Sequence, residues 1–228
     1  MKPFCSGGLK DVRIIQAIQK NALSPAQVNP FYFPEPLAPL AAARKQGRIL
    51  RIEEAISAIR DAASRCDLLL VEGAGGVLVP VGDTFTVADV IASLDCEVVV
   101  VARNQLGTIN HTNLTIEALQ FRKVGRLKVV LMNNNRRDSS FDSNASMLRQ
   151  TIGNIGVFEL PHLGKQPLLR RLLKDCVKKT KKTLAQISDP DSFCPVVRGA
   201  GKNSESNELK KRKKPLTVSA AKVKLAPH

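Results

Sequence analysis

The stretch DLLLVEGAGGVLVP, residues 67–80, joins a short apolar run to one glutamate and a cluster of glycines. The run Leu68–Val71 is bounded by turn signals, which is typical of a strand buried on both faces of a parallel sheet. Glu72 then lies at the carboxyl end of the predicted strand. Gly73 and Gly75 allow the backbone to turn sharply and to approach a ligand closely.

Open α/β sheets bind their ligands beyond the carboxyl ends of the strands. A carboxylate in that position commonly holds Mg²⁺ or orients a group beside a phosphate. Glu72 is therefore a candidate metal ligand. This stretch alone leaves a second interpretation open, a glycine-rich loop with an exposed glutamate.

The pattern on both sides of this stretch alternates between strands and helices. Strands are predicted over residues 67–71, 97–102, 127–132 and 157–160, and helices within residues 8–21, 40–44, 52–65, 86–94, 110–123, 143–152 and 168–184. Residues 24–39 are rich in proline and are expected to form a surface connection with short extended pieces. The alternation predicts a doubly wound α/β fold with a mostly parallel sheet, helices on both faces and right-handed crossovers.

The composition indicates one α/β domain with a full core. The chain has 228 residues, of which 43% are hydrophobic, and no apolar run reaches the roughly 18 residues that a membrane span needs. No signal peptide is recognised at the start. The five cysteines are widely spaced without a C-x-x-C pair, and the three histidines are scattered. We therefore expect a cytoplasmic protein with reduced thiols, no membrane contact and no zinc site.

The net charge of +15 is concentrated in the last third of the chain, because residues 164–228 hold 17 Lys and Arg against 5 Asp and Glu. We predict a domain over residues 1–187 and a disordered linker and basic tail over 188–228. The run KKRKK, residues 210–214, is interpreted as a solvated tail, with contact to RNA or anionic lipid left open. A stacking platform for single-stranded nucleic acid is not expected, because basic and aromatic residues do not interleave.

Several motifs, taken together, resemble one enzyme family. In chain order they are MKPFCSGGLKD from Met1, VNPFYFPEPLAPLAAA from Val28, DLLLVEGAGGVLVPV from Asp67, VVVVARNQLGTINHTNLTIEAL from Val98, VVLMNNN from Val129 and FELPHL from Phe158. Their order and spacing resemble dethiobiotin synthetase, over residues 2–163. The pairing of VEGAGG with N-x-L-G-T-I-N-H-T about 30 residues later is the most specific part.

The resemblance implies an ATP-dependent ligase of biotin biosynthesis with a P-loop-NTPase-like fold. The family's substrates are 7,8-diaminononanoate, CO₂ and ATP, its metal is Mg²⁺, and it is a homodimer. One amine captures CO₂ as a carbamate, ATP phosphorylates the carbamate, and the second amine closes the ring of dethiobiotin. Catalysis of this kind depends on positioning and charge neutralisation.

The resemblance also assigns roles to residues near the start of the chain. Lys2 matches the lysine that binds the carbamate and the phosphoryl group, where a compact ammonium offsets developing charge. Ser6 matches a substrate-binding serine. Asp11 and Glu72 match two carboxylates on Mg²⁺, a suitable hard-oxygen set. A helix N-cap remains an equal alternative for Asp11.

The remaining matches lie further along the chain. The resemblance implies that the nucleotide is contacted by Asp11, Glu72, Gly73, Gly75, Asn133, Pro161, His162 and Leu163. It implies that the substrate is contacted by Ser6, Leu106, Gly107, Thr108, Ile109 and Asn110. Residues 106–112 open a helix, which favours an anion, and in the family bind the substrate carboxylate across a dimer interface. His111 is interpreted as a structural or cap residue rather than a base. Asn134 and Asn135 are alternatives to Asn133 as the adenine contact.

The chain departs from the family pattern at its start, because G-x-x-x-x-G-K-[ST] occurs nowhere in the sequence. The family's first strand and this phosphate-binding Walker A loop are expected to be missing. Two other interpretations stay open: a non-catalytic dimeric remnant acting as a binding or scaffold protein, and another P-loop relative such as a cobyrinate-type amide ligase or a partition ATPase.

Overall fold

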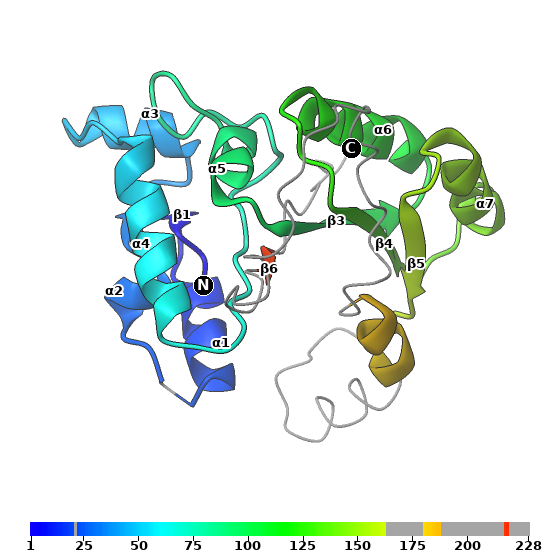
Figure 1. Cartoon of the computed structure of the whole chain (residues 1–228), viewed down its shortest axis with the longest axis horizontal. Coiled ribbons are helices and arrows are strands. Elements are labelled where there is room, and N and C mark those ends of the chain that lie inside the picture. The colour runs from blue at the N-terminus through cyan, green and yellow to red at the C-terminus, as the bar shows by residue number, and fades with distance from the viewer. Residues whose placement is uncertain (21, 163–179, 188–216, 219–228) are drawn as a thin grey trace, which may run out of the picture.

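The computed structural model describes residues 1–20, 22–162, 180–187 and 217–218 of the chain (Figure 1). Helices alternate with short strands along it. The elements are β1 (Phe4–Ser6), α1 (Lys10–Ile18), α2 (Pro25–Val28), β2 (Phe31–Phe33), α3 (Pro39–Lys45), α4 (Ile52–Ser64), α5 (Val87–Leu94), β3 (Glu97–Asn104), α6 (Thr108–Phe121), β4 (Leu127–Asn133), α7 (Phe141–Thr151), β5 (Gly156–Leu160) and β6 (Thr217–Val218). Residues 180–187 form a further helix.

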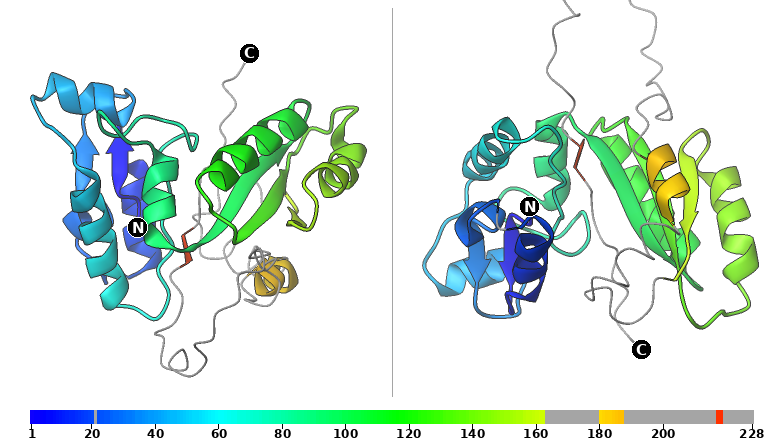
Figure 2. Two further views of the ribbon diagram at one scale, coloured as in Figure 1. Left: turned by 45° about the horizontal axis from the view of Figure 1, so that its top comes forward. Right: turned by 90° about the horizontal axis from the view of Figure 1, so that it is seen from below.

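The strands form two sheets, and every strand pairing is parallel. One sheet has the order β1-β2, and the other has the order β5-β4-β3-β6. The first sheet belongs to the N-terminal half of the chain and the second to the C-terminal half, and β6 lies between the two halves (Figures 1 and 2). Parallel strands with helical crossovers confirm the predicted α/β class.

Helices cover both faces of the larger sheet (Figure 2). Val98, Val100 and Val129 belong to the main core, together with Ile91 of α5 and Leu119 of α6. Side chains of the intervening positions, Val99 and Val130, form a separate cluster against Ile187 on the opposite face. The alternation follows from the two-residue period of a strand. It explains why VVVVA, residues 98–102, and VVLM, residues 129–132, are continuous apolar runs.

Lys128, the second residue of β4, is buried, with 0% of its surface exposed. Its Nζ donates to the carbonyl oxygens of Gln186, at 3.3 Å, and Ile187. The same nitrogen lies 6.0 Å from the centre of the Phe158 ring. These carbonyls belong to the last turn of the helix at residues 180–187, where intrahelical partners are lacking and a positive charge is favourable. Lys128 therefore fastens that helix to the sheet.

The predicted strand at residues 67–71 is wrong in detail. This segment is extended but forms no strand, and its nearest backbone neighbour is Met1, which donates from N to the Leu70 oxygen at 2.7 Å and accepts from the Glu72 N–H at 2.9 Å. Leu69 is buried, whereas Leu68 and Leu70 are 54% and 55% exposed. The side chains of this segment alternate as in a strand. However, no strand in the described part of the chain pairs with the side of the segment that faces away from Met1.

The other predicted helices and strands within the described residues are confirmed to within a few positions. The sequence interpretation missed the strand character of β1 and the short helix α2, since both are brief and lie close to prolines. Residues 168–179 of the last predicted helix and nearly all of the predicted tail lie outside the described residues, so the boundary at residue 187 stays a prediction. No helix in the described ranges is long and apolar enough to cross a bilayer.

Candidate active site

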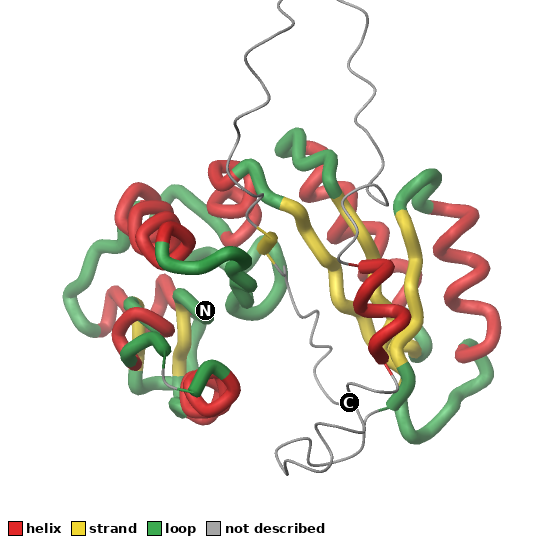
Figure 3. Tube along the Cα trace, turned by 60° about the horizontal axis from the view of Figure 1, so that its bottom comes forward, coloured by secondary structure: helices red, strands yellow, loops and turns green. Residues whose placement is uncertain are grey.

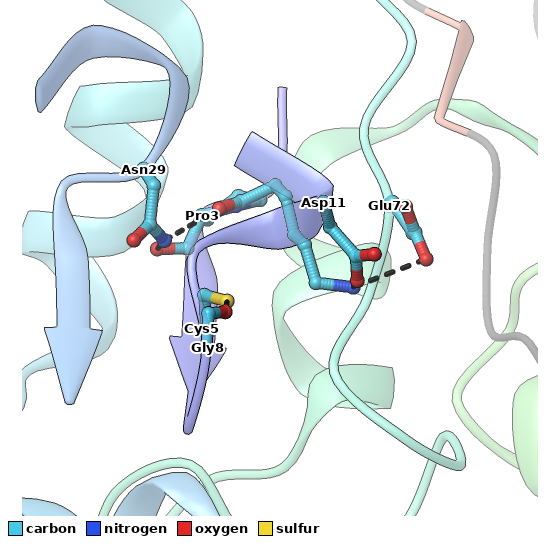
Figure 4. Close-up of polar contacts among 7 residues, drawn as sticks. Pro3, Cys5, Gly8, Asp11, Asn29 and Glu72 are labelled. Carbon is cyan, nitrogen blue, oxygen red and sulfur yellow. Dashed lines mark hydrogen bonds and ion pairs between the residues drawn. The ribbon is translucent and has the colours of Figure 1, made fainter. Parts of the chain in front are cut away.

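The ammonium group of Lys2 lies between two carboxylates. Its Nζ is 3.0 Å from Glu72 Oε1 and 3.2 Å from Asp11 Oδ2. Figure 4 shows the carboxylates of Asp11, from α1, and of Glu72 close to one another. The Lys2 side chain is only 11% exposed, while those of Asp11 and Glu72 are 51% and 35% exposed. A buried cation thus holds two carboxylates that remain open to solvent.

Backbone contacts fix the position of Lys2. Its N–H donates to the Val28 oxygen at 2.9 Å. The buried side chain of Asn29 donates from Nδ2 to the oxygens of Lys2, at 2.8 Å, and Pro3, at 3.0 Å. Glu72 is fixed in turn through its N–H bond to Met1. Asn29 is a supporting residue that sequence reasoning missed, because an asparagine before a proline normally indicates a turn.

Burial and charge act in opposite directions on the Lys2 ammonium. Burial alone would lower the pKa of Lys2, but the charge and hydrogen bond of Glu72, with those of Asp11, outweigh it and raise the pKa above the ordinary lysine value. Lys2 therefore stays protonated at neutral pH. It provides a permanent positive charge just before β1, beside Glu72 at the end of the extended run at residues 68–71.

Asp11 lies in the first turn of α1, one residue inside the helix. The N-cap position belongs to Leu9, and no side chain caps the helix there. The alternative interpretation of Asp11 as an N-cap is therefore wrong. The carboxylate points to Lys2 instead, and its place in the first helical turn is also favourable for the helix dipole.

The two carboxylates fit a magnesium ion by their donor chemistry. Both already converge on one cationic nitrogen, within 3.2 Å, and Mg²⁺ in nucleotide sites takes one or two carboxylates together with phosphate oxygens and water. Within the described ranges no group of three or more His, Cys, Asp or Glu side chains gathers as a metal site. The pair Asp11 and Glu72 is thus suited to an ion shared with a phosphate ligand.

The turn after β1 sets the position of Ser6. Gly7 has φ +87°, and a side chain there would approach Pro36 Cβ to 3.2 Å. Tyr32 donates its hydroxyl to the Gly7 oxygen at 2.9 Å, and Cys5 donates its thiol to the Gly8 oxygen at 3.4 Å. Burial raises the pKa of Cys5, which keeps that thiol protonated. Ser6 consequently stands at the carboxyl end of β1.

The loop after Glu72 also requires glycine. Gly75 has φ +73°, and a Cβ on it would lie 3.0 Å from Val79 Cγ2. Gly73 is partly exposed beside it. The sharp turn predicted for this loop is therefore present at Gly75.

A second polar cluster lies at the carboxyl ends of β3 and β4, where Asn104 and Asn133 are paired in register. Asn104 is 1% exposed and donates from Nδ2 to Asn133 Oδ1 at 2.9 Å. Asn144 of α7 donates to Asn104 Oδ1 at 2.8 Å. Asn134 points back to Gln105 Oε1, at 3.1 Å, and Asn135 is exposed. Asn104 and Asn144 were missed by sequence reasoning, although an asparagine at the end of an apolar strand is a usable signal.

Two members of the triplet contact Asn104: Asn133 accepts from its side chain, and Asn134 donates to its backbone oxygen at 3.4 Å. Within the described residues, no hydrogen bond or ion pair links Asn133 directly to the group around Lys2. Pro161 and His162 follow β5 as exposed residues, and Leu163 lies outside the described part. The structure thus brings Lys2, Asp11 and Glu72 into contact, whereas Asn133 belongs to the separate cluster around Asn104.

The start of α6 offers free backbone donors. Gly107 precedes the helix with φ +88°, and the Leu106 N–H donates to Asp138 Oδ2 at 2.8 Å. The N–H groups of Ile109 and Asn110 form no hydrogen bond within the described ranges. Such a helix start favours an anion. His111 lies one turn into the helix and accepts from Thr115 Oγ1 through its main-chain oxygen. This contact does not involve the imidazole, so the structural role of His111 stays a prediction.

Comparison with known proteins identifies relatives of this chain. A family model described as an AAA domain matches residues 1–174. The chain is 31% identical to ATP-dependent dethiobiotin synthetase of Bacillus subtilis strain 168 over 182 residues, which cover 77% of this chain and 76% of the relative. It is 42% identical to the Bacillus licheniformis protein of the same name over 121 residues, 51% of this chain and 52% of the relative.

A third protein with that name, from Anaeromyxobacter dehalogenans strain 2CP-1, is 48% identical over 102 residues, 45% of this chain and 46% of the relative. The matched part therefore spans about half the length of two of these relatives and about three quarters of the third. The identity is highest over the shorter matches.

Proposed function

The chain belongs to the ATP-dependent dethiobiotin synthetase family, and we propose that it forms dethiobiotin from 7,8-diaminononanoate, CO₂ and MgATP. The observation that carries the proposal is the group of Lys2, Asp11 and Glu72, in which two carboxylates face one buried ammonium at 3.0 and 3.2 Å. A phosphoryl transfer to a carbamate needs both a metal site and a fixed positive charge.

The proposed reaction has three steps. One amine of the substrate attacks CO₂ and loses a proton, which gives a carbamate. A carbamate oxygen then attacks the γ-phosphorus of ATP, the bond to ADP breaks, and a carbamic–phosphoric anhydride results. Finally the second amine attacks the carbamate carbon, inorganic phosphate leaves, and a second proton is released as the cyclic urea closes.

Lys2 is the proposed catalytic residue. Its pKa is raised, so it does not act as a base, and its role is to attract the carbamate oxygens and offset the charge that develops on the transferred phosphoryl group. Glu72 and Asp11 would hold Mg²⁺, which neutralises phosphate charge when bound. The Lys2 ammonium and these carboxylates would separate slightly as substrate and metal enter between them.

The other predicted contacts complete the proposal. Ser6, at the end of β1, would hydrogen-bond the substrate. The start of α6, with Leu106, Gly107, Thr108, Ile109 and Asn110, would bind the substrate carboxylate through the free N–H groups. The nucleotide would lie against Gly73, Gly75 and Asn133 and under the loop that begins at Pro161 and His162.

Assembly as a homodimer is part of the same proposal. One side of α6 carries Asn110, Leu114, Glu117 and Phe121, which recur at helical spacing and are exposed. Leu114 is 54% exposed and Phe121 is 86% exposed. Large apolar side chains on one exposed face are a usual mark of an interaction site. A second subunit on this face would lie next to the proposed carboxylate site.

The test is a product assay for dethiobiotin with 7,8-diaminononanoate, bicarbonate and MgATP. It compares the 228-residue chain with a fusion that carries a family-type Walker A segment ahead of Lys2, because that motif occurs nowhere in this sequence. We expect product from the fusion and at least a thousandfold less from the chain alone, since about three charge-assisted bonds to phosphate are lost. A fusion that binds MgATP but forms no product would favour the non-catalytic alternative.

A further inference from the structure

The turn between β3 and α6 is bonded through its backbone to residues 134–144, which follow β4 and enter α7. Figure 3 shows the strands of the larger sheet side by side, with the long loop that leads into α7 at one end of them. Asn134 donates from Nδ2 to the main-chain oxygen of Asn104 at 3.4 Å, and Asn144 donates from Nδ2 to that of Gln105, also at 3.4 Å. Two consecutive residues of the turn are thus held by the same segment.

The third residue of the turn, Leu106, forms the shortest of these bonds. Its N–H donates to Asp138 Oδ2 at 2.8 Å. A bond to an ionised carboxylate is about twice as strong as one between neutral groups, whereas 3.4 Å is longer than an ordinary N–H···O bond. Leu106 is 75% exposed, so packing of its side chain does little to hold the backbone. The bond from Asp138 therefore contributes most to the position of the turn.

Asp138 is itself fixed in direction by Ser140. Asp138 Oδ1 accepts from the Ser140 N–H at 2.9 Å and from the Ser140 hydroxyl at 2.6 Å, so the two carboxylate oxygens have separate partners. The hydrogen bonds from Ser140 and Leu106 lower the pKa of Asp138. The side chain is therefore ionised at neutral pH and directed at Leu106.

The backbone that Asp138 holds leads directly into the free donors of α6. Gly107 follows Leu106 with φ +88°, and the N–H groups of Ile109 and Asn110 form no hydrogen bond within the described ranges. Because glycine adopts many backbone angles at little cost, Gly107 does not by itself determine where these N–H groups point. The bond at Leu106 selects one orientation of the turn, and with it the direction of the donors.

We propose that Asp138 is a positioning residue for the substrate carboxylate, because its hold on the Leu106 N–H directs the N–H groups of Ile109 and Asn110 at that carboxylate. The inference rests on the proposed function, in which diaminononanoate binds at the start of α6. Asp138 acts through the turn and does not touch the substrate. Its negative charge alone would repel a carboxylate. Loss of Asp138 should thus weaken binding if the turn matters, and strengthen it if only the charge matters.

An NMR titration of the 228-residue chain with 7,8-diaminononanoate tests the proposal at the amides of Ile109 and Asn110. In Asp138→Ala the dissociation constant should rise about tenfold or more, as expected for the loss of one charge-assisted bond. Asp142→Ala is the matched control and should leave binding unchanged, because Asp142 lies in α7 with its side chain 90% exposed and 3.9 Å from Arg137. Amides of α4 report whether each variant keeps its fold.

Asp138→Asn is a second variant that keeps the shape of the side chain. An amide has one acceptor oxygen, which cannot accept from Leu106 and Ser140 as the two carboxylate oxygens do, so binding should again weaken although the negative charge is gone. In a fusion that makes dethiobiotin, both variants should raise KM for diaminononanoate and leave kcat unchanged, since they affect binding that is equal in the ground and transition states. A general loss of folded protein would lower the apparent kcat instead.

The outcomes separate this inference from the proposed function. Unchanged or tighter binding in Asp138→Asn would overturn the role of Asp138 and leave the proposed function standing. Weaker binding in the Asp138 variants, with no product from any fusion, would support the role of Asp138 and count against the proposed function. If diaminononanoate does not shift the amides of Ile109 and Asn110 in the unaltered chain, the carboxylate site and the role of Asp138 are both wrong.

Discussion

Lys2 and Glu72 are 70 positions apart in sequence, yet Lys2 Nζ donates to Glu72 Oε1 at 3.0 Å. The bond connects the segment before β1 with the loop that follows the extended run at residues 68–71. It is the contact on which the proposed chemistry depends most directly, and each of its two partners has a testable role.

Replacing Glu72 by Gln should preserve the fold and remove most magnesium-dependent turnover. The change keeps the shape of the side chain but removes one of two hard anionic ligands. In a fusion that makes dethiobiotin, the turnover number should fall by about 10²-fold, as for the loss of a preorganised electrostatic group. Glu53→Gln, on the exposed side of α4, is the matched control. Equal turnover of Glu72→Gln and Glu53→Gln across a Mg²⁺ titration would refute the assignment.

Replacing Lys2 by Met should strengthen binding of a divalent cation. The variant removes the ammonium between Asp11 and Glu72 and leaves two carboxylates directed at one place. Affinity for Mn²⁺, measured by electron paramagnetic resonance, should increase about tenfold or more, because the competing positive charge is gone. The double variant Lys2→Met with Glu72→Gln should lose that gain. An affinity that stays at the level of the unaltered chain contradicts a shared cation position.

Replacing Asn104 by Leu should destabilise the fold. Asn104 is 1% exposed and bonds to Asn133, Asn144 and the Phe141 oxygen, so the change leaves buried polar groups without a partner. We expect a loss of about 2–3 kcal/mol in the free energy of unfolding. The measurement is urea unfolding, with an unchanged slope as the sign of an intact two-state transition. Asn135→Ala, at an exposed position two residues beyond Asn133, should change stability little. A comparable loss of unfolding free energy in both variants would show that the cluster around Asn104 stabilises the fold no more than an exposed asparagine does.

The stability contributed by Asp89 should depend on acid pH. Its carboxylate accepts from the Thr86 N–H at 2.7 Å and from Arg122 Nε at 2.6 Å. Burial alone would raise the pKa of Asp89, but the bonds from Arg122 and Thr86 outweigh it and lower the pKa. A lowered pKa means that the stabilisation is complete above the unfolded-state value of about 3.9 and is lost as pH falls through the folded value.

Asp89→Asn should therefore cost about 1 kcal/mol at pH 7, in the range of a lost helix cap. The difference between the two proteins should shrink as the pH is lowered below about 4. The measurement is a series of urea titrations between neutral and acid pH. A difference that stays constant through the acid range would contradict the role of the ionised carboxylate.

Dimer formation should depend on the exposed face of α6. Leu114→Glu introduces a charge into the proposed interface and should weaken association by about 2 kcal/mol or more, as for a central interface residue. Sedimentation at several protein concentrations measures this change. Leu78→Glu is the control, since Leu78 is equally exposed at 55% but lies far along the chain, before α5. Monomers at all concentrations in the unaltered protein would refute the dimer.

The larger sheet and its helices could be predicted from sequence because their segments carry strong periodic signals. β3 and β4 contain the continuous apolar runs VVVVA and VVLM, and α4 repeats Ile and Ala at helical spacing. The same signal predicts a strand at residues 67–71, which the structure does not contain. A strand is defined by its hydrogen bonds to a neighbouring strand, and none of the described strands pairs with this segment. β1 was missed because three residues beside a proline carry no readable period.

The residues of the candidate site likewise divide into those that the sequence could identify and those that it could not. Lys2, Asp11 and Glu72 were identified through a family resemblance, and the structure places them in contact. Asn29, Asn104 and Asn144, which hold the neighbouring backbones and side chains, could not be recognised, since a buried and an exposed asparagine look alike in sequence. Their importance follows from burial and bonding partners, which depend on the tertiary fold.

The bond between Lys128 and the end of the helix at residues 180–187 has a consequence for limited proteolysis. The helix is held by a buried ammonium from β4 and by packing of Ile187, and not only by the peptide chain that leads to it. A protease that cleaves between residues 163 and 179 would therefore leave residues 180–187 bound to the sheet as a non-covalent fragment. Denaturing electrophoresis would then report two pieces, while gel filtration would still report one particle.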